Sequence, residues 1–235
     1  MLARMIRGVM FDFSGTLFRI ESVEEWLDTL GLDLPEAERT ACVERLTAAG
    51  ALPGGPQPLR APDGWGERDV SARHHRTAYT AQTRAALLPA VGPERVDALA
   101  AELYERHRSP DAWRAYPDAE AVLKELRQRG AGVAVVSNIG WDLRPVFGRH
   151  GLDEYVDAYV LSYELEIQKP PDPRIFRTAC DLIGLPPEQV LMVGDDVPCD
   201  GGATALGCAF LQVEPLPVDQ RPDALLPCLA SVTGS

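Results

Sequence analysis

The feature that most constrains the fold is a set of short apolar segments that each end abruptly in polar, turn-forming residues. The first of them, residues 6–13, reaches Asp12 just before a polar turn that contains a glycine. Two later segments, 132–136 and 190–193, are apolar throughout. Continuous apolar runs of this length are typical of strands that are buried on both faces of a parallel sheet.

In the second half of the chain these strands alternate with helices. In residues 118–130, for example, Ala121, Val122 and Leu126 share one helical face and Gly130 follows the last turn. Such alternation predicts an α/β fold whose parallel sheet is covered by helices on both faces. We expect strands at 6–13, 132–136, 155–161, 190–193 and 208–213, and helices at 118–130, 142–150, 173–183, from about 195 to 206, and 224–229.

Residues 21–111 have a different texture. Apolar residues recur at helical spacing around 23–30, 42–46, 74–88 and 96–104, and no segment reads as a strand. A stretch rich in proline and glycine, residues 52–66, predicts a long loop. We therefore expect a helical insertion at 21–111 within an α/β core formed by residues 1–20 and 112–235.

Composition excludes several classes of protein. The formal net charge of −12 argues against a protein that binds the nucleic-acid backbone, which needs a basic face. No apolar run reaches the roughly 18 residues of a membrane span, and the N-terminal apolar run reads as a buried strand rather than a signal peptide. The five cysteines are irregularly spaced and form no C-x-x-C pair, which favours the reducing cytoplasm over a disulfide scaffold or a zinc site.

Asp12 lies at the end of the first strand, where ligands bind in open α/β sheets. A carboxylate there can attack an electrophile or bind a hard cation such as Mg²⁺. Gly15 permits a sharp turn, and the hydroxyl of Thr16 can donate to an anionic oxygen. A competing interpretation is that Asp12 merely caps the turn.

Two further polar positions suit an anionic ligand. Ser137 and Asn138 end the strand at 132–136, where a hydroxyl and an amide can hold a phosphate oxygen, although a simple turn would have the same residues. Lys169 is followed by three prolines within four residues, and the rigid backbone lowers the entropic cost of positioning its ammonium. A solvated loop lysine is the alternative.

The strand at 190–193 ends in a group of carboxylates. Asp195 and Asp196 follow it directly and Asp200 lies further on. Adjacent carboxylates repel one another unless a cation lies near them, although Asp196 could also serve as a helix cap. Taken in order, the four strand ends and loops provide a nucleophile, hydroxyl donors, a cation and metal ligands, which together suit phosphoryl transfer.

These residues resemble the motifs of the haloacid dehalogenase (HAD) superfamily of hydrolases. The resemblance implies a Rossmann-like core, a helical C1 cap at 21–111, and an active site between them. The four matching motifs are Asp12-Phe13-Ser14-Gly15-Thr16, Ser137-Asn138, Lys169-Pro170, and Gly194-Asp195-Asp196 with Asp200.

The resemblance also implies roles for these residues. Asp12 would form an aspartyl-phosphate, and Thr16, Ser137 and Lys169 would bind the transferring group. Mg²⁺ would be held by Asp12, Asp195 and the Ser14 carbonyl, with Asp196 or Asp200 assisting. We therefore expect a Mg²⁺-dependent phosphatase or phosphotransferase that acts on a small phosphorylated metabolite.

Position 14 departs from the family pattern, because family phosphatases carry there a second aspartate that acts as general acid and base. Loss of such a group typically lowers the rate by about 10²–10⁴-fold. Several explanations remain open: a substrate with a good leaving group such as an acyl phosphate, slow turnover, a replacement acid such as Asp196, Asp69 or His74, or a non-catalytic binding or regulatory protein.

Dehalogenation at carbon is a further alternative. Dehalogenases carry Tyr at the position of Ser14 and lack the metal-binding pair that this chain has in Asp195 and Asp196. Phosphonoacetaldehyde hydrolases need a cap lysine, and residues 21–111 contain none. Within the expected cap, the basic segment 68–76 could contact an anionic substrate or form a solvated helix face. Trp65 and Trp113 could line the cleft or pack at the hinge.

Overall fold

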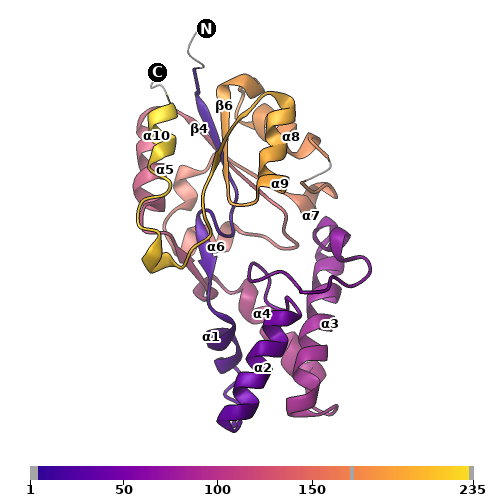
Figure 1. Ribbon diagram of the computed structural model, residues 1–235. Helices are drawn as coiled ribbons and strands as arrows, with labels where there is room; N and C mark the ends of the chain where they lie inside the picture. Colours follow the sequence, from indigo (N-terminus) through magenta and orange to yellow (C-terminus); the bar gives the residue numbers. More distant parts are fainter. Residues whose placement is uncertain (1–4, 170–171, 233–235) are drawn as a thin grey trace.

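The computed structural model describes residues 5–169 and 172–232. Pro170 and Pro171, on which the expected rigidity of the lysine loop partly rests, lie outside the described residues. An α/β layer holds the main sheet and both chain ends, and a layer of helices lies below it (Figure 1). The expected α/β fold is confirmed.

The main sheet is parallel and has the strand order β5-β4-β1-β6-β7. Its central strand, β1, pairs with β4 and β6 in a register that sets Phe11 beside both Val135 and Val193. The carboxyl ends of these three strands therefore meet at one edge of the sheet. The strand bounds are β1 Gly8–Phe11, β4 Gly132–Ser137, β5 Ala158–Leu161, β6 Val190–Gly194 and β7 Ala209–Gln212.

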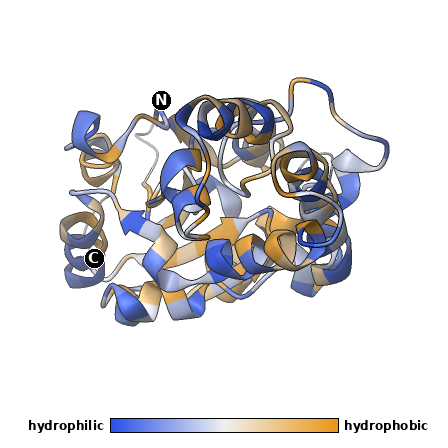
Figure 2. Ribbon diagram, turned by 90° about the horizontal axis from the view of Figure 1, so that it is seen from below, coloured by the Kyte–Doolittle hydropathy of each residue, from blue (hydrophilic) through white to orange (hydrophobic). Residues whose placement is uncertain are grey.

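Helices cover both faces of this sheet. Successive strand residues point to opposite faces, so neighbouring residues of one strand pack against different helices. Val9 and Phe11 pack in one core cluster with residues of α5, α6 and α10, and Met10 packs in a second cluster with residues of α8. The colouring of Figure 2 shows hydrophobic residues on the inner strands and mixed faces on the helices around them. The helix bounds are α5 Ala119–Gln128, α6 Arg144–Arg149, α7 Ser162–Leu165, α8 Arg174–Leu182, α9 Val197–Asp200 and α10 Pro227–Ser231.

The second layer is built of helices that lie within residues 21–111. Two short antiparallel strands, β2 (Phe18–Ile20) and β3 (Trp113–Ala115), carry the chain into it and back. None of the helices in the described residues is both long enough and apolar enough to cross a membrane. The helices of this layer are α1 Val23–Asp28, α2 Glu36–Ala48, α3 Ala72–Val91 and α4 Val96–Arg108, with the 3₁₀ helix η1 at Trp65–Val70.

Several expected elements have different bounds, and three of these differences have a local structural cause. The strand expected from residue 155 begins at Ala158, because Asp153–Tyr155 forms a 3₁₀ turn. The helix expected after β6 consists of the short α9 and a 3₁₀ segment at Gly201–Leu206. The tail helix runs over 227–231 rather than 224–229, because Pro227 suits a first helical position and lacks the N–H that an interior position needs.

Candidate active site

The polar residues that follow β1, β4 and β6 meet in one cavity. The Asp12 N–H donates to the Val193 carbonyl at 2.9 Å, so the ladder between β1 and β6 continues up to Asp12. Ser137, the last residue of β4, is buried and lines the same cavity of about 180 Å³ as Asp12. Residues of the helical layer line the opposite side of the cavity, so it lies between the two layers.

Lys169 lies at the base of this cavity and is not a solvated loop lysine. Its ammonium is buried and donates to Asp12 Oδ1 at 2.9 Å, Asp200 Oδ1 at 2.6 Å and the Val136 carbonyl at 2.9 Å. Burial opposes the charge on Lys169, but the two carboxylates outweigh it and hold the pKa of Lys169 above its usual range.

Asn138 fixes the backbone of the lysine loop from both sides. Its side-chain Nδ2 donates to the Lys169 carbonyl at 2.5 Å, and its Oδ1 accepts from the Lys169 N–H at 2.8 Å. This paired contact uses one N–H of the amide, and Asn138 lines the cavity together with the neighbouring Ser137. Asn138 therefore positions the backbone of Lys169.

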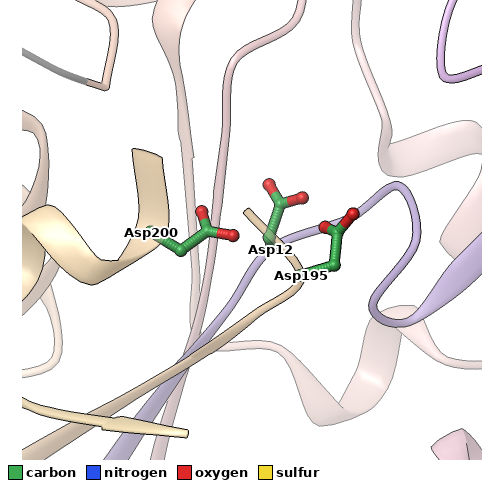
Figure 3. A group of neighbouring side chains, drawn as sticks. All are labelled: Asp12, Asp195 and Asp200. Carbon is green, nitrogen blue, oxygen red and sulfur yellow. The ribbon is translucent and has the colours of Figure 1, made fainter. Parts of the chain in front are cut away.

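Three carboxylates gather beside the lysine. Oxygen atoms of Asp12, Asp195 and Asp200 all lie within 4.8 Å of one another, and Figure 3 shows the three side chains together at the end of β1, the end of β6 and on α9. Burial and the nearby carboxylates raise the pKa of Asp195 to about 7, and burial is the main cause that raises that of Asp200 to about 6. Three hard oxygen donors that repel one another fit a divalent cation such as Mg²⁺.

Asp196 is not a member of this group. It is the N-cap of α9, where its Oδ1 accepts from the Cys199 N–H at 3.0 Å and its own N–H donates to Asp200 Oδ2 at 3.1 Å. Its exposed side chain still borders the cavity. The contacts of Asp196 are those of a helix cap. Asp200, rather than Asp196, joins Asp12 and Asp195 in the group of carboxylates.

Ser14 and Thr16 lie on either side of the turn after β1. The Ser14 hydroxyl donates to the Gly54 carbonyl of the helical layer at 3.3 Å. Gly54 has a φ of +77°, and a Cβ there would approach Ser14 Oγ and a ring carbon of Trp113 to 2.8 Å. The buried Thr16 hydroxyl donates to Asp195 Oδ1 at 3.4 Å, so it contacts the carboxylate group.

Arg221 supports this turn and was missed in the sequence. Its buried guanidinium donates to the carbonyls of Gly15, at 2.7 Å, and Thr16. The Arg221 guanidinium also lies over the ring of Tyr116, 3.1 Å from the centroid. No motif marks an arginine in a proline-rich tail, and its only signal is that it is the single basic residue after Arg177.

The helical layer contributes Arg68, Asp69, His75 and Tyr79 to the cavity wall. The basic segment 68–76 is therefore divided between the two alternatives considered for it. Arg68, Asp69 and His75 line the cavity. The side chains of Arg73, His74 and Arg76 are exposed. Trp113 is buried and lines the cavity, and Trp65 packs instead on Tyr79 with ring centroids 5.0 Å apart.

Comparison with known proteins shows the family. Residues 6–205 match the model of the haloacid dehalogenase-like hydrolases, and the chain belongs to that family. The human haloacid dehalogenase-like hydrolase domain-containing protein 3 is 38% identical over 123 residues, which are 52% of this chain and 49% of that protein.

Relatives and solved structures include both phosphatases and dehalogenases. The phosphoserine phosphatase of Thermus thermophilus is 42% identical over 106 residues, which are 44% of this chain and 41% of that protein. The chain thus matches no more than about half the length of these two relatives. A crystal structure of a dehalogenase with an intermediate complex is 23% identical, covers 100% of both chains and has a TM-score of 0.62, which supports the fold.

Proposed function

We propose that the protein is a Mg²⁺-dependent phosphatase or phosphotransferase that acts on a small phosphorylated metabolite through an aspartyl-phosphate on Asp12. Residues 1–20 and 112–235 form its core domain, and residues 21–111 form the cap. The observation that carries the proposal is the group of carboxylates of Asp12, Asp195 and Asp200, whose oxygen atoms all lie within 4.8 Å of one another. The buried Lys169 ammonium, which contacts Asp12 at 2.9 Å in the cavity between the two layers, supports it.

The contacts of Lys169 suit the attack of one anion on another. A carboxylate and a phosphate approach each other only when positive charge offsets their repulsion. Lys169 supplies one such charge next to the Asp12 carboxylate. Ser137 is in position to donate its hydroxyl to a phosphoryl oxygen, because it is buried and faces the same cavity, and Thr16 holds Asp195.

Asp12, Asp195 and Asp200, together with the Ser14 carbonyl, are the residues that would hold Mg²⁺. When bound, the cation supplies further positive charge beside the transferring phosphoryl group. Asp196 acts on this site through its backbone, because its N–H orients Asp200.

Displacement of a halide from carbon by Asp12 is the second candidate, and relatives such as (S)-2-haloacid dehalogenase 4A of Burkholderia cepacia favour it. The same Lys169–Asp12 contact would serve that reaction. The group of three carboxylates favours phosphoryl transfer, because a dehalogenase needs no divalent cation to bring its nucleophile to a carbon atom.

Cellular context follows from composition and thiols. The cysteines, all within the described residues, form no disulfide, which supports a location in the cytoplasm. The acidic net charge of −12 supports a small-molecule substrate rather than a nucleic acid.

Phosphate release from a panel of small phosphorylated metabolites, with Mg²⁺ and with EDTA, tests the proposal. We expect release with Mg²⁺, loss of release with EDTA, and loss in Asp12→Asn but not in Asp63→Asn, whose carboxyl lies in an exposed loop. A silent wild-type protein would refute phosphatase function. Halide release from 2-haloacids that is insensitive to EDTA would establish the second candidate instead.

A further inference from the structure

The cavity has a carboxyl group on its cap side as well as on its core side. Among the cavity-lining residues that the described part of the cap provides, Asp69 alone carries a carboxyl group. Asp69 is 6% exposed, whereas Glu67, two residues earlier on the same 3₁₀ helix, is exposed. The carboxyl group of Asp69 therefore faces Asp12 and Lys169 across the space that a substrate would occupy.

Contacts with the core hold η1 over the site. The Ser162 hydroxyl donates to the Asp69 carbonyl at 2.6 Å. The side chain of Gln168, the residue before Lys169, donates to the Gly66 carbonyl. These two contacts, one on each side of Arg68, fix the position of the Asp69 backbone relative to the core. The carboxyl group is thus carried by an anchored segment rather than by a free loop.

A neighbouring cap residue is fitted to the core in the same way. A Cβ on Gly140, three residues after Ser137, would approach the His75 side chain to 2.1 Å. The absence of a side chain at Gly140 lets His75 enter the cavity wall close to Asp69, with Nε2 3.8 Å from Asp69 Oδ1. Both cap residues are therefore matched to this closed arrangement of the two layers.

The surroundings of Asp69 bring the pKa of its carboxyl group close to neutral pH. Burial raises the pKa of Asp69 to about 6, against the opposing effect of Arg68, 3.5 Å away, and of Lys169. The other titratable groups that face it are His75 and Tyr79 of α3. An acid whose pKa lies near neutral pH is the most effective in proton transfer.

The other two residues considered as a replacement acid are less suited. His74 is exposed and its ring faces Ser71, at 3.1 Å, rather than the cavity. Asp196 is engaged as the N-cap of α9. His75 is in the cavity wall, but burial lowers its pKa to about 3 and its Nδ1 is paired with the Tyr104 hydroxyl at 2.8 Å, so it stays neutral.

We propose that Asp69 of the cap is the general acid and base of the reaction, in place of the carboxyl group that position 14 lacks. This inference rests on the proposed phosphoryl transfer through Asp12. It assigns the two halves of the chemistry to different layers, because the core supplies the nucleophile and the cap supplies the proton.

The proposed reaction has two chemical steps, and Asp69 takes part in one proton transfer in each. Asp12 attacks phosphorus, the bond from phosphorus to the leaving oxygen breaks, and the Asp69 carboxyl proton passes to that oxygen, which gives an alcohol. Asp69 is then a carboxylate and takes a proton from water as the water oxygen attacks the aspartyl-phosphate. The bond to Asp12 breaks, inorganic phosphate leaves, and Asp69 is protonated again.

The dependence of rate on leaving group tests this role. We would measure kcat/KM for 4-nitrophenyl, phenyl and butyl phosphate with Mg²⁺, in the wild type, Asp69→Asn and the control Glu67→Gln. We expect Asp69→Asn to lower the value for butyl phosphate by about 10²–10⁴-fold, and that for 4-nitrophenyl phosphate by less than about tenfold, because a stable phenolate leaves without a proton. Glu67→Gln should match the wild type.

The outcomes separate this inference from the proposed function. A wild type that releases no phosphate from any substrate refutes both. An active wild type with an Asp69→Asn variant that is unchanged, or equally weakened on all three esters, refutes the role of Asp69 alone. A second test uses the wild type alone. Its kcat/KM should depend more steeply on leaving-group pKa at about pH 8.5 than at about pH 6. An equal dependence at the two pH values would also refute the role of Asp69.

Discussion

Replacing Lys169 with methionine removes the central charge of the site while keeping a side chain of similar length. The ammonium is buried and balances Asp12 and Asp200, at 2.9 and 2.6 Å. Removal of one partner from a buried ion pair typically costs about 3–5 kcal/mol, because the remaining charge stays buried without compensation. We expect a loss of this size in the free energy of unfolding at about pH 8 without Mg²⁺.

The loss should shrink as the pH falls. The pKa values of Asp195 and Asp200, about 7 and about 6, lie above those of an unfolded chain, so the folded protein holds more protons between about pH 4 and pH 7. Its stability from these groups therefore falls as the pH rises through that range. The raised pKa of Lys169 adds stability that is constant there, because it is fully present below about pH 10.

Without the ammonium, these carboxyl pKa values rise further, so the folded variant binds about one more proton than the wild type between about pH 6 and pH 8. Below that range the wild type is itself protonated at Asp195 and Asp200. Each additional proton widens the stability gap by about 1.4 kcal/mol per pH unit, or about 3 kcal/mol between pH 6 and pH 8. At pH 5 the gap should be about 1 kcal/mol, the size of a lost hydrogen bond.

Urea unfolding at pH 5 and pH 8 measures this gap. Lys124→Met is the matched control, since Lys124 is exposed on α5 and is the one other lysine of the chain. Mg²⁺ should narrow the gap at pH 8, because a second cation then offsets the carboxylates. A gap of equal size at the two pH values would refute the electrostatic reasoning and indicate lost packing.

Two further predictions concern the turn after β1. Arg221→Met should lower the free energy of unfolding by about 2–4 kcal/mol, because two buried carbonyls lose a charged donor. Arg174→Met is the control and should leave the free energy of unfolding nearly unchanged, because Arg174 is exposed. Urea unfolding compares the two variants. Gly54→Ala should raise KM and destabilise the protein more than Gly64→Ala, since both have positive φ but only at position 54 would a Cβ meet Ser14. Equal effects of the two glycine variants would show that backbone strain alone is responsible.

The meeting of the core residues at one cavity could be predicted from sequence. Parallel strands bring their carboxyl ends to one edge, so the residues after β1, β4 and β6 had to lie close together once the sheet was recognised. The burial of Lys169 follows from a similar argument only in part. Its position before a helix was clear, but its contacts with Val136 and Asp200 depend on the packing of two loops.

Other features depended on contacts that leave no local pattern. Strand β3 has three residues, which is too few for an alternation of apolar and polar side chains to be seen. The division of labour between Asp196 and Asp200 depends on where α9 begins. Asp196 is the N-cap of α9, and Asp200, about one helical turn further along, is buried. Arg221 reaches the site only in the tertiary structure, where this tail residue contacts the carbonyls of Gly15 and Thr16.

The serine at position 14 and the carboxyl group at position 69 have a common geometric explanation. The Ser14 hydroxyl donates to the carbonyl of Gly54 in the cap, 3.3 Å away. An aspartate at position 14 would turn a carboxylate toward that carbonyl, and two acceptors cannot share a hydrogen bond. A cap that closes with Gly54 against position 14 therefore favours a small donor there. The same closure brings Asp69 into the cavity through the Ser162 contact, so the cap that excludes an acid from the core can itself provide one.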